Sequence, residues 1–303
     1  MDLELKTKNI NWFICGLIDA EGSFGVNLIK HYSSTTGYAV LTYFEIGMNS
    51  KDKNLLELIK ETLNLNCNLY YNSNDDTYKL KVSNLNDIIN IIIPFFYKYT
   101  LFSKKRGDFL LMTKVVDILK SKEHLTIKGL NEIVNIKASM NLGLPDKLKL
   151  EFLNVHPIER LKFDPININS SWLAGFIEGE GCFFISVYDS PKSKLGKAVQ
   201  LVFKITQHIR DIVLLENIKN HLNCGRIEIR KSNEACDFTV TSINDFKDNI
   251  IPFFEHYNLV GEKLHDYKDF KLVYDIMINK GHLTNEGLLE IIKIKSNMNT
   301  KRI

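Results

Sequence analysis

Two short segments of the chain combine apolar residues, small residues and two carboxylates in the same order. The first is Ile14–Gly22, which reads ICGLIDAEG, and the second is Leu173–Gly181, which reads LAGFIEGEG. The last acids of the two segments are Glu21 and Glu180. A carboxylate at the C-terminal end of a helix faces the negative end of the helix dipole, so a fold that keeps two of them indicates a bound cation. Mg²⁺ fits this role, because it is a hard ion that one or two carboxylates hold together with substrate phosphates.

The chemistry that such acids support is hydrolysis of a phosphodiester, where a metal ion activates water and stabilises the leaving oxygen. A single acid at such a position would be interpreted as a helix-capping or surface residue. An acid at the same position in both segments favours a metal-binding role. Asp19 and Glu178 lie about 200° around the helix from the terminal acids, and we expect them to form helix-end or interface hydrogen bonds. Small residues four apart let two helices approach closely. They are Gly16, Ala20, Gly175 and Gly179.

The whole chain is an internal duplication. Pro94–Phe96 returns as Pro252–Phe254, and 252 − 94 is 158. The sequences HLT and IKxxMN return at the same distance. We therefore predict an N-terminal half over residues 1–141, a linker over 142–168 and a C-terminal half over 169–303. A period this long excludes a solenoid and indicates an ancestral homodimer with pseudo-two-fold symmetry.

The composition is that of an ordinary globular protein, with 45% hydrophobic and 25% charged residues. A net charge of +3 permits nucleic-acid binding without arguing for it, so any basic surface must be local. No apolar run approaches the ~20 residues of a membrane helix, and we expect no membrane partner. The five cysteines form no CxxC pair, which predicts reduced thiols inside a cell. Abundant Asn, Ile and Lys suggest an AT-rich organellar gene and a mitochondrial location.

Alternating apolar residues predict strands, and 3.6-residue periodicity predicts helices. The fold class is α+β, with two pseudo-symmetric αββαββα halves and antiparallel sheets. In the first half we predict a helix from Asn9 or Asn11 to Glu21 with Gly22 as its C-cap. Strands are expected at 23–30, 38–48, 70–71 and 78–83, and helices at 51–63, 85–93, 105–119, 129–138 and, in the linker, 146–153. Strands of the second half are expected at 182–187, 199–206, 226–230 and 237–241.

One face of each sheet is polar. The ordinary alternative is a solvated face, but these side chains are of the types that read bases in the major groove. Strands of ten residues span roughly ten base pairs, so two sheets would cover about twenty. The strand near 69–72 stays unassigned, because a slip of one residue exchanges its faces. Candidate DNA-contacting residues are Ser23, Asn27, Ile29, His31, Ala39, Leu41, Tyr43, Glu45, Lys79, Lys81 and Ser83 in the first half. In the second half they are Cys182, Phe184, Ser186, Tyr188, Gln200, Val202, Lys204, Thr206, Arg226, Glu228, Arg230, Asp237, Thr239 and Thr241.

The paired motifs and the later landmarks resemble the single-chain LAGLIDADG homing endonucleases, or meganucleases, and their I-OnuI-like subgroup. The resemblance implies packed central motif helices and a saddle of two sheets over double-stranded DNA. It implies that Glu21 and Glu180 bind the metal, with the carbonyls of Ala20 and Gly179 as further ligands. Both strands would be cut to leave 3′ overhangs by a monomeric, intron-encoded enzyme. Mn²⁺ or Ca²⁺ is expected to occupy the same sites, with Ca²⁺ supporting binding without cleavage.

Several residues carry a functional and a structural alternative. Lys105 and Lys263 are repeat partners that the resemblance places near the cut site, and solvated helix-start lysines are the alternative. His124 and His282 are expected to cap or pack, and both tryptophans are expected to pack.

Two other functions remain open at this point. A maturase would bind its intron RNA, and a silent regulator would bind DNA without cutting it. Intact acids in both motifs favour the nuclease, since neither alternative requires a pair of metal-binding carboxylates.

Overall fold

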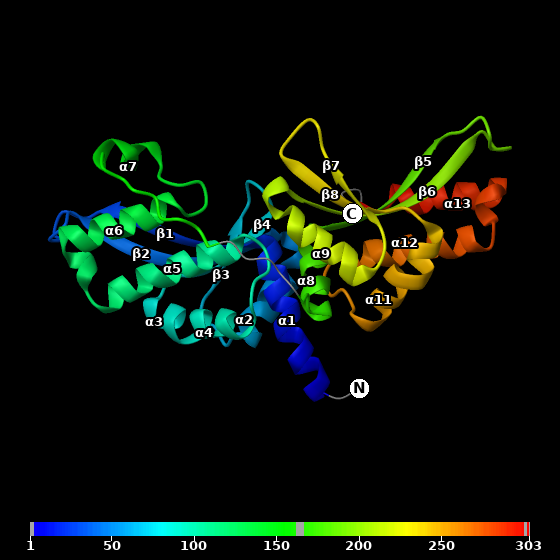
Figure 1. The fold of residues 1–303 in the computed structure, drawn as a ribbon. Coiled ribbons are helices and arrows are strands. Elements are labelled where there is room, and N and C mark those ends of the chain that lie inside the picture. The colour runs from blue at the N-terminus through cyan, green and yellow to red at the C-terminus, as the bar shows by residue number, and fades with distance from the viewer. Residues whose placement is uncertain (1–2, 162–166, 300–301, 303) are drawn as a thin grey trace. The chain divides into compact units, whose positions relative to one another are not determined.

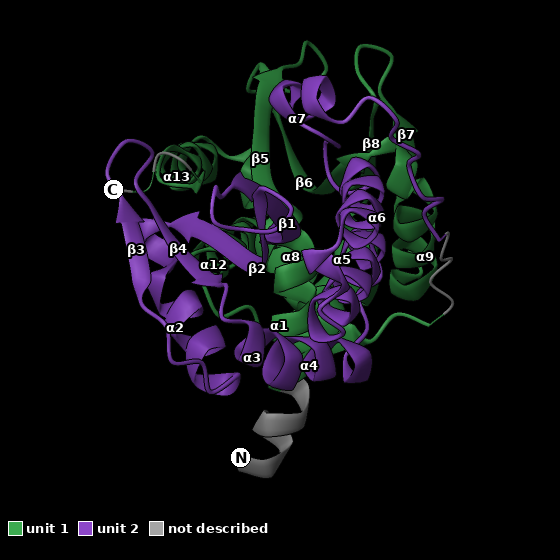
Figure 2. Ribbon diagram, turned by 90° about the vertical axis from the view of Figure 1, so that its left-hand side faces the viewer, with its two compact units in different colours: residues 1–20, 165–303 green, residues 21–164 purple. Residues whose placement is uncertain are grey.

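The computed structural model describes residues 3–161, 167–299 and 302, with side chains from Ile10 onward. Its contacts divide the chain into two compact units, which Figure 2 shows in green and purple. Unit 1 comprises Met1–Ala20 and Pro165–Ile303, and unit 2 comprises Glu21–Asp164. The compact units therefore differ from the repeat halves at the first helix, which packs with the second repeat. In the part of the chain described, no helix is long and apolar enough to cross a membrane.

Unit 2 is a four-stranded antiparallel sheet with helices packed on one face (Figure 1). Its strands lie in the order β1 (Gly22–Lys30), β2 (Tyr38–Asn49), β4 (Thr77–Val82) and β3 (Leu69–Asn72). Its helical segments are η1 (Ser50–Asp52), α2 (Lys53–Thr62), α3 (Leu85–Asp87), η2 (Ile88–Ile92), α4 (Ile93–Lys98), α5 (Lys105–Lys120), η3 (Glu123–Leu125), α6 (Ile127–Ala138) and α7 (Asp146–Glu151).

Unit 1 contains the second repeat and the first motif helix. Its strands lie in the order β5 (Gly181–Asp189), β6 (Lys197–His208), β8 (Ala235–Val240) and β7 (Arg226–Ile229), again antiparallel. Its helical segments are α1 (Leu3–Glu21), α8 (Ser170–Glu180), η4 (Ile209–Asp211), α9 (Ile212–Leu222), α10 (Ile243–Asp245), η5 (Phe246–Ile250), α11 (Ile251–His256), α12 (Lys263–Ile278), η6 (Gly281–Leu283) and α13 (Asn285–Ser296). The predicted α+β class with two antiparallel sheets is confirmed.

Aromatic side chains form the core beneath the apolar face of each sheet. In unit 2, the Phe24 ring lies 5.0 Å from the Phe96 ring of α4 and 5.4 Å from the Phe109 ring of α5. In unit 1, Phe183 occupies the same position and packs against the equivalent helices. The strand faces that alternation predicted as buried are therefore the faces that the helices cover.

Several predicted helix boundaries are wrong. Helix α1 begins at Leu3 rather than near Asn9 or Asn11, because the residues before them are also of helix-favouring types. Gly22 does not form a left-handed cap, since strand β1 begins at this residue. The helix predicted over 85–93 runs to Lys98 as α3, a π-helical turn and α4, with Pro94 in the first turn of α4, where its missing N–H is tolerated.

Each repeat ends in the same hydrogen-bonded clamp. Asn141 has a φ of 49°, its Nδ2 donates to the Phe24 carbonyl at 2.9 Å, and its N–H donates to Asp108 Oδ1 at 2.9 Å. Asn299, with a φ of 58°, makes both bonds to the equivalent residues of unit 1. The MN landmark of the repeat is therefore a structural element that ties the end of a helical hairpin to the first strand.

Most of the predicted linker, over residues 142–161, packs on unit 2, whereas its last described residues, 167 and 168, belong to unit 1. Leu148 of α7 is buried against Val134 of α6. Arg160 Nη2 donates to Asp108 Oδ2 at 2.8 Å. Helix α7 ends at Glu151, earlier than predicted, because Phe152 adopts an extended conformation.

Candidate metal-binding acids and nucleic-acid interface

The two motif helices, α1 and α8, pack backbone against backbone at their glycines. A Cβ atom placed on Gly16 would lie 2.7 Å from the carbonyl carbon of Trp172 and closer to its oxygen. A Cβ atom placed on Gly175 would lie 2.7 Å from the carbonyl carbon of Phe13. Real Cβ atoms essentially never come within 3.0 Å of such neighbours. The close helix approach predicted from the small residues is therefore confirmed at these two positions.

The last residue of each motif helix is the candidate metal-binding acid. Glu21 ends α1 and is exposed, and Glu180 ends α8 and is half-buried. The earlier acids are buried instead, with Asp19 at 1% and Glu178 at 5% exposure. Glu178 Oε2 accepts a hydrogen bond from the Val260 N–H at 2.8 Å. Glu178 is therefore a buried hydrogen-bond acceptor near the end of α8, within its own repeat.

A lysine ammonium lies against the end of α8. Lys263 is the first residue of α12, and its Nζ donates to the Gly181 carbonyl at 2.5 Å and to the Gly179 carbonyl at 3.4 Å. Its repeat partner Lys105 is the first residue of α5 and is also half-buried. The Lys263 ammonium shows that the carbonyls at this helix end are oriented to receive a cation.

The donors at the end of α8 fit a hard divalent ion. They are a carboxylate from Glu180 and the carbonyl of Gly179, both oxygen ligands of the kind that Mg²⁺ and Ca²⁺ prefer. Among the residues that the structure describes, no three His, Cys, Asp or Glu side chains gather in an arrangement that could hold a metal.

The predicted polar face of the second repeat exists, and hydrogen bonds connect it. The register pairs Thr206 with Asp237 and Asp237 with Glu228 across three strands. Arg226 Nε donates to Glu228 Oε1 at 2.9 Å. The Arg226 side chain holds the pKa of the Glu228 carboxyl below its usual value, mainly by this hydrogen bond.

Three predicted contact residues of this face are buried. Val202 is 5% exposed, and Asp237 and Thr239 are each 3% exposed. Arg230 and Lys204 hydrogen-bond to Asp237, and Thr239 donates to Glu228, so these buried residues would support the surface and not touch a base directly. The exposed or half-exposed members are Cys182, Phe184, Ser186, Tyr188, Gln200, Lys204, Thr206, Arg226, Glu228, Arg230 and Thr241.

In the first repeat, Glu45 is the centre of the polar face. Lys81 Nζ lies 3.2 Å from Glu45 Oε2 and 4.5 Å from the centre of the Tyr43 ring, and Lys79 Nζ lies 3.9 Å from Glu45 Oε1. The predicted residues Ser23, Asn27, Ile29, Ala39 and Leu41 are also at least partly exposed, and His31 and Ser83 lie just beyond strand ends.

Two residues that sequence reasoning left out also lie on this face. Tyr70 pairs with Lys79 and is 61% exposed, and Asn72 follows it two positions along β3. The residues Leu-Tyr-Tyr-Asn of β3 fit either orientation, and only pairing with β4 decides between them. These residues join the candidate DNA-contacting set.

Trp172, His124 and His282 lie at structural positions rather than on the polar sheet faces. Trp172 is fully buried and stacks on Phe176, with ring centroids 4.8 Å apart, as expected of a packing residue. His124 and His282 lie in the short helices before α6 and α13. The caps of those two longer helices come from the threonines that follow the histidines.

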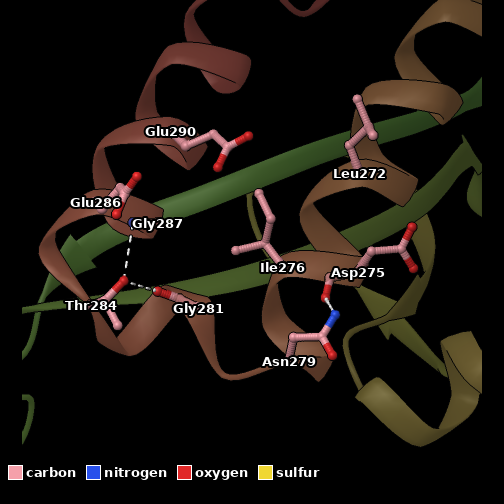
Figure 3. A pocket seen from close by; sticks show the side chains of 9 residues that line it. All are labelled: Leu272, Asp275, Ile276, Asn279, Gly281, Thr284, Glu286, Gly287 and Glu290. Atoms are coloured by element: carbon pink, nitrogen blue, oxygen red, sulfur yellow. Dashed lines mark hydrogen bonds between the residues drawn. The ribbon is translucent and has the colours of Figure 1, made fainter.

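A separate hollow of about 440 Å³ lies between α12 and α13 (Figure 3). Thr284 Oγ1 accepts from the Gly287 N–H at 3.1 Å and shapes its rim. Its acids are Asp275, Glu286 and Glu290, and no strand residue lines it. The hollow is therefore distinct from the polar sheet face, and its acidic lining would repel phosphate.

Comparisons with known proteins identify the class that this fold and these motifs define. The family model described as LAGLIDADG endonuclease matches residues 14–116 and 173–274. The chain belongs to the LAGLIDADG endonuclease family, and the resemblance drawn from the two motifs is confirmed.

Individual relatives agree with this assignment. The chain is 39% identical over 300 residues to "Probable intron-encoded endonuclease 2" of Neurospora crassa, covering 94% of this chain and 64% of that protein. The crystal structure of the I-LtrWI LAGLIDADG homing endonuclease bound to target DNA has a TM-score of 0.97 at 65% identity, covering 98% of this chain and 100% of that chain. The structure of I-SmaMI bound to uncleaved DNA with calcium ions has a TM-score of 0.92 at 40% identity, covering 95% and 98%.

Proposed function

We propose that this chain is a homing endonuclease that binds one long DNA site and cuts both strands by Mg²⁺-dependent hydrolysis, leaving 3′ overhangs. The observation that carries the proposal is the symmetric placement of Glu21 and Glu180 as last residues of the motif helices. Membership of the LAGLIDADG family and similarity to two DNA-bound homing endonucleases support it.

In this proposal each terminal acid binds a divalent cation, with the carbonyl of Ala20 or Gly179 as a second protein ligand. The bound ion supplies activation of water and stabilisation of the leaving oxygen. Lys105 and Lys263 provide positive charge beside these ligands. The polar faces of the two sheets contact about twenty base pairs between them. The protein acts as a monomer, since one chain carries both motifs.

An organellar location belongs to the same proposal. The Neurospora crassa relative is named as intron-encoded, and the chain is rich in residues with AT-rich codons. We infer an intron gene in a mitochondrial genome as the source.

Cleavage selection tests the proposal directly. A pool of randomised duplexes is incubated with the protein and Mg²⁺, and the cut ends are sequenced to give the target. Glu21→Gln and Glu180→Gln are expected to reduce cleavage by at least roughly 10- to 100-fold, the loss that follows even when an outer-shell partner of a metal ligand is changed. Both variants should still bind the target in Ca²⁺.

The matched control is Glu178→Gln, the same change two residues earlier on α8. Glutamine keeps an oxygen that can accept from Val260, so this variant should cut normally. Filter binding of the intron RNA against the duplex DNA target tests the maturase alternative, which predicts preference for the RNA. Normal cleavage by Glu21→Gln or Glu180→Gln would refute the metal-binding role, and binding without any cleavage by the unaltered protein would refute the nuclease.

A further inference from the structure

Asp237 on β8 is a buried carboxylate in the middle of the polar face of the second repeat. Arg230 donates to it from two nitrogens, from Nε to Oδ2 at 2.8 Å and from Nη2 to Oδ1 at 2.7 Å. Thr206 Oγ1 donates to Oδ1 at 2.6 Å, and Lys204 Nζ donates to Oδ2 at 3.4 Å. A single acid therefore joins β6, β8 and the residue that follows β7.

The charges of this cluster explain why the acid stays ionised. Burial by itself raises the pKa of the Asp237 carboxyl, but the hydrogen bonds from Arg230 and Thr206 and the charge of Lys204 outweigh it, so the pKa lies below its ordinary value. A buried carboxylate that loses its partners is strongly unfavourable. The two basic side chains are thus held in fixed positions by the acid between them.

The geometry determines which donors Arg230 can offer to a ligand. Its Nε and Nη2 contact Asp237, and Nη2 also lies 3.1 Å from Thr206 Oγ1. Within the part of the chain that the structure describes, Nη1 is the guanidinium nitrogen with no hydrogen bond to the protein. The Arg230 side chain is 38% exposed and that of Lys204 is 27% exposed. Each can therefore direct a donor away from the sheet while the acid beneath stays covered.

The first repeat has the opposite arrangement at the equivalent positions. Lys204 pairs across the sheet with Thr239 as Glu45 pairs with Lys81. In the same register Asp237 corresponds to Lys79. The first repeat therefore has an acid where the second has Lys204, and a base where the second has Asp237. The first-repeat acid, Glu45, has a 27% exposed side chain, against 5% for Asp237. The buried cluster is therefore a property of the second repeat alone.

We propose that Asp237 is a positioning residue that fixes Arg230 and Lys204 to read guanine in the half of the DNA site bound by the second repeat. Guanine N7 and O6 are the major-groove acceptors that arginine and lysine donors match. Fixing a long basic side chain before binding reduces the entropy lost when the contact forms. The cluster also lowers the net positive charge of the face, so it favours discrimination between bases over general attraction to phosphate. This inference rests on the proposed DNA-binding function.

The test is a binding profile measured in Ca²⁺, so that cleavage plays no part. Each base pair of the selected target is replaced in turn, and affinity is measured for the unaltered protein and for Asp237→Asn. The variant should lose roughly tenfold in discrimination at one or two guanine-containing pairs of one half-site, near the lower end of the range for a bidentate contact, because Arg230 offers a ligand only its Nη1. Its affinity for unrelated duplex should be equal or higher and should depend more steeply on salt, because one negative charge has been removed.

Two comparison variants separate positioning from charge. Asp189→Asn removes one negative charge from the same sheet, at an exposed residue paired with Lys197. It should change the salt dependence and the affinity for unrelated duplex in the same direction as Asp237→Asn, and it should leave the base profile unchanged. Arg230→Met should lose discrimination at the same base pairs as Asp237→Asn. Thr206→Val removes one hydrogen bond to the acid and should lose less at those pairs.

The outcomes distinguish this inference from the proposed function. An unchanged base profile in Asp237→Asn, or a uniform loss of affinity over all duplexes, would overturn the positioning role. Should that variant fail to fold by circular dichroism, Thr206→Val decides, and an unchanged profile in it overturns the role equally. Absence of duplex binding by the unaltered protein would overturn both the proposed function and this inference.

Discussion

The crossing of α1 and α8 gives a prediction whose size follows from the structure. In Gly175→Ala, the new Cβ would meet the Phe13 carbonyl carbon at 2.7 Å, where ordinary contacts begin at 3.4 Å. The Phe13 carbonyl oxygen would lie closer still, so the helices would have to separate by more than the roughly 0.7 Å that the carbon alone requires. The obstacle is backbone and cannot rotate away. Such overpacking costs roughly 1–3 kcal/mol. Because the obstacle here is a backbone carbonyl, we expect a free-energy cost near the upper value.

Helix propensity acts in the opposite direction and must be subtracted. Alanine is favoured over glycine in a helix interior by about 1 kcal/mol. We therefore expect Gly175→Ala to lower the free energy of unfolding by a net ~2 kcal/mol. The matched control is Gly107→Ala in α5, where the nearest group is the movable Arg160 guanidinium at 3.3 Å. That variant should be neutral or slightly more stable.

The assay is urea denaturation followed by tryptophan fluorescence and by circular dichroism. The chain has two tryptophans, Trp12 and Trp172, and both belong to the motif helices. Fluorescence thus reports on the region that the substitution changes, and circular dichroism serves for Gly107→Ala. A Gly175→Ala protein as stable as the unaltered one would refute the inferred helix contact.

A second substitution tests the same reasoning through additivity. Gly16→Ala would clash with Trp172 and Phe176 across the same crossing. One separation of the helices relieves both clashes, so the double variant should lose less stability than the sum of the two single variants. Strict additivity would show that the two glycines act independently.

Three further predictions concern single residues. Asn141→Ala should be about 1 kcal/mol less stable in urea than Asn141→Gly, since both lose the bond to Phe24 and alanine alone is strained at positive φ; equal stabilities would contradict this. Burial, with a smaller effect of the Asp245 charge, raises the pKa of Cys224 to about 12, so iodoacetamide at pH 9 should leave this thiol unmodified until the protein unfolds, as peptide mass spectrometry would show. Because the pKa of Asp237 is depressed, its carboxylate stabilises the fold above the ordinary pKa of about 4 and loses this effect as pH falls through the folded value. The stability difference between unaltered protein and Asp237→Asn should shrink in acid, and a difference that grows in acid would be evidence against the cluster.

Periodicity predicted the features that depend on local pattern. Alternation identified the strands and their buried faces, as Phe24 and Phe44 show by their 1% and 0% exposure. Small residues four apart predicted the helix crossing before any contact was known. Repetition of the motif identified Glu21 and Glu180 at the helix ends. Neither the alternation of the strands nor the spacing of the small residues explains an acid at those positions.

Features that depend on pairing or on tertiary cover could not be read from the sequence. The faces of β3 follow from its register with β4, since Leu69–Asn72 shows no alternation of its own. Asp237 has a residue type expected at the surface, and it is buried because a distant arginine and lysine cover it. The linker docks through Leu148, an isolated apolar contact in a segment without periodicity.

The two repeats separate positions that serve the scaffold from positions to which the proposed function assigns recognition. Asn141 and Asn299 keep the same backbone clamp, with positive φ in both. At equivalent positions on the sheet surface, by contrast, Glu45 has become Lys204 and Lys79 has become Asp237. Exchanging charge at those positions leaves the strand register intact, because the register depends on the apolar face. Under the proposed function, a chain built in this way can change the base sequence that one half recognises without changing how that half folds, whereas a change at the clamp or at the helix crossing would affect folding first.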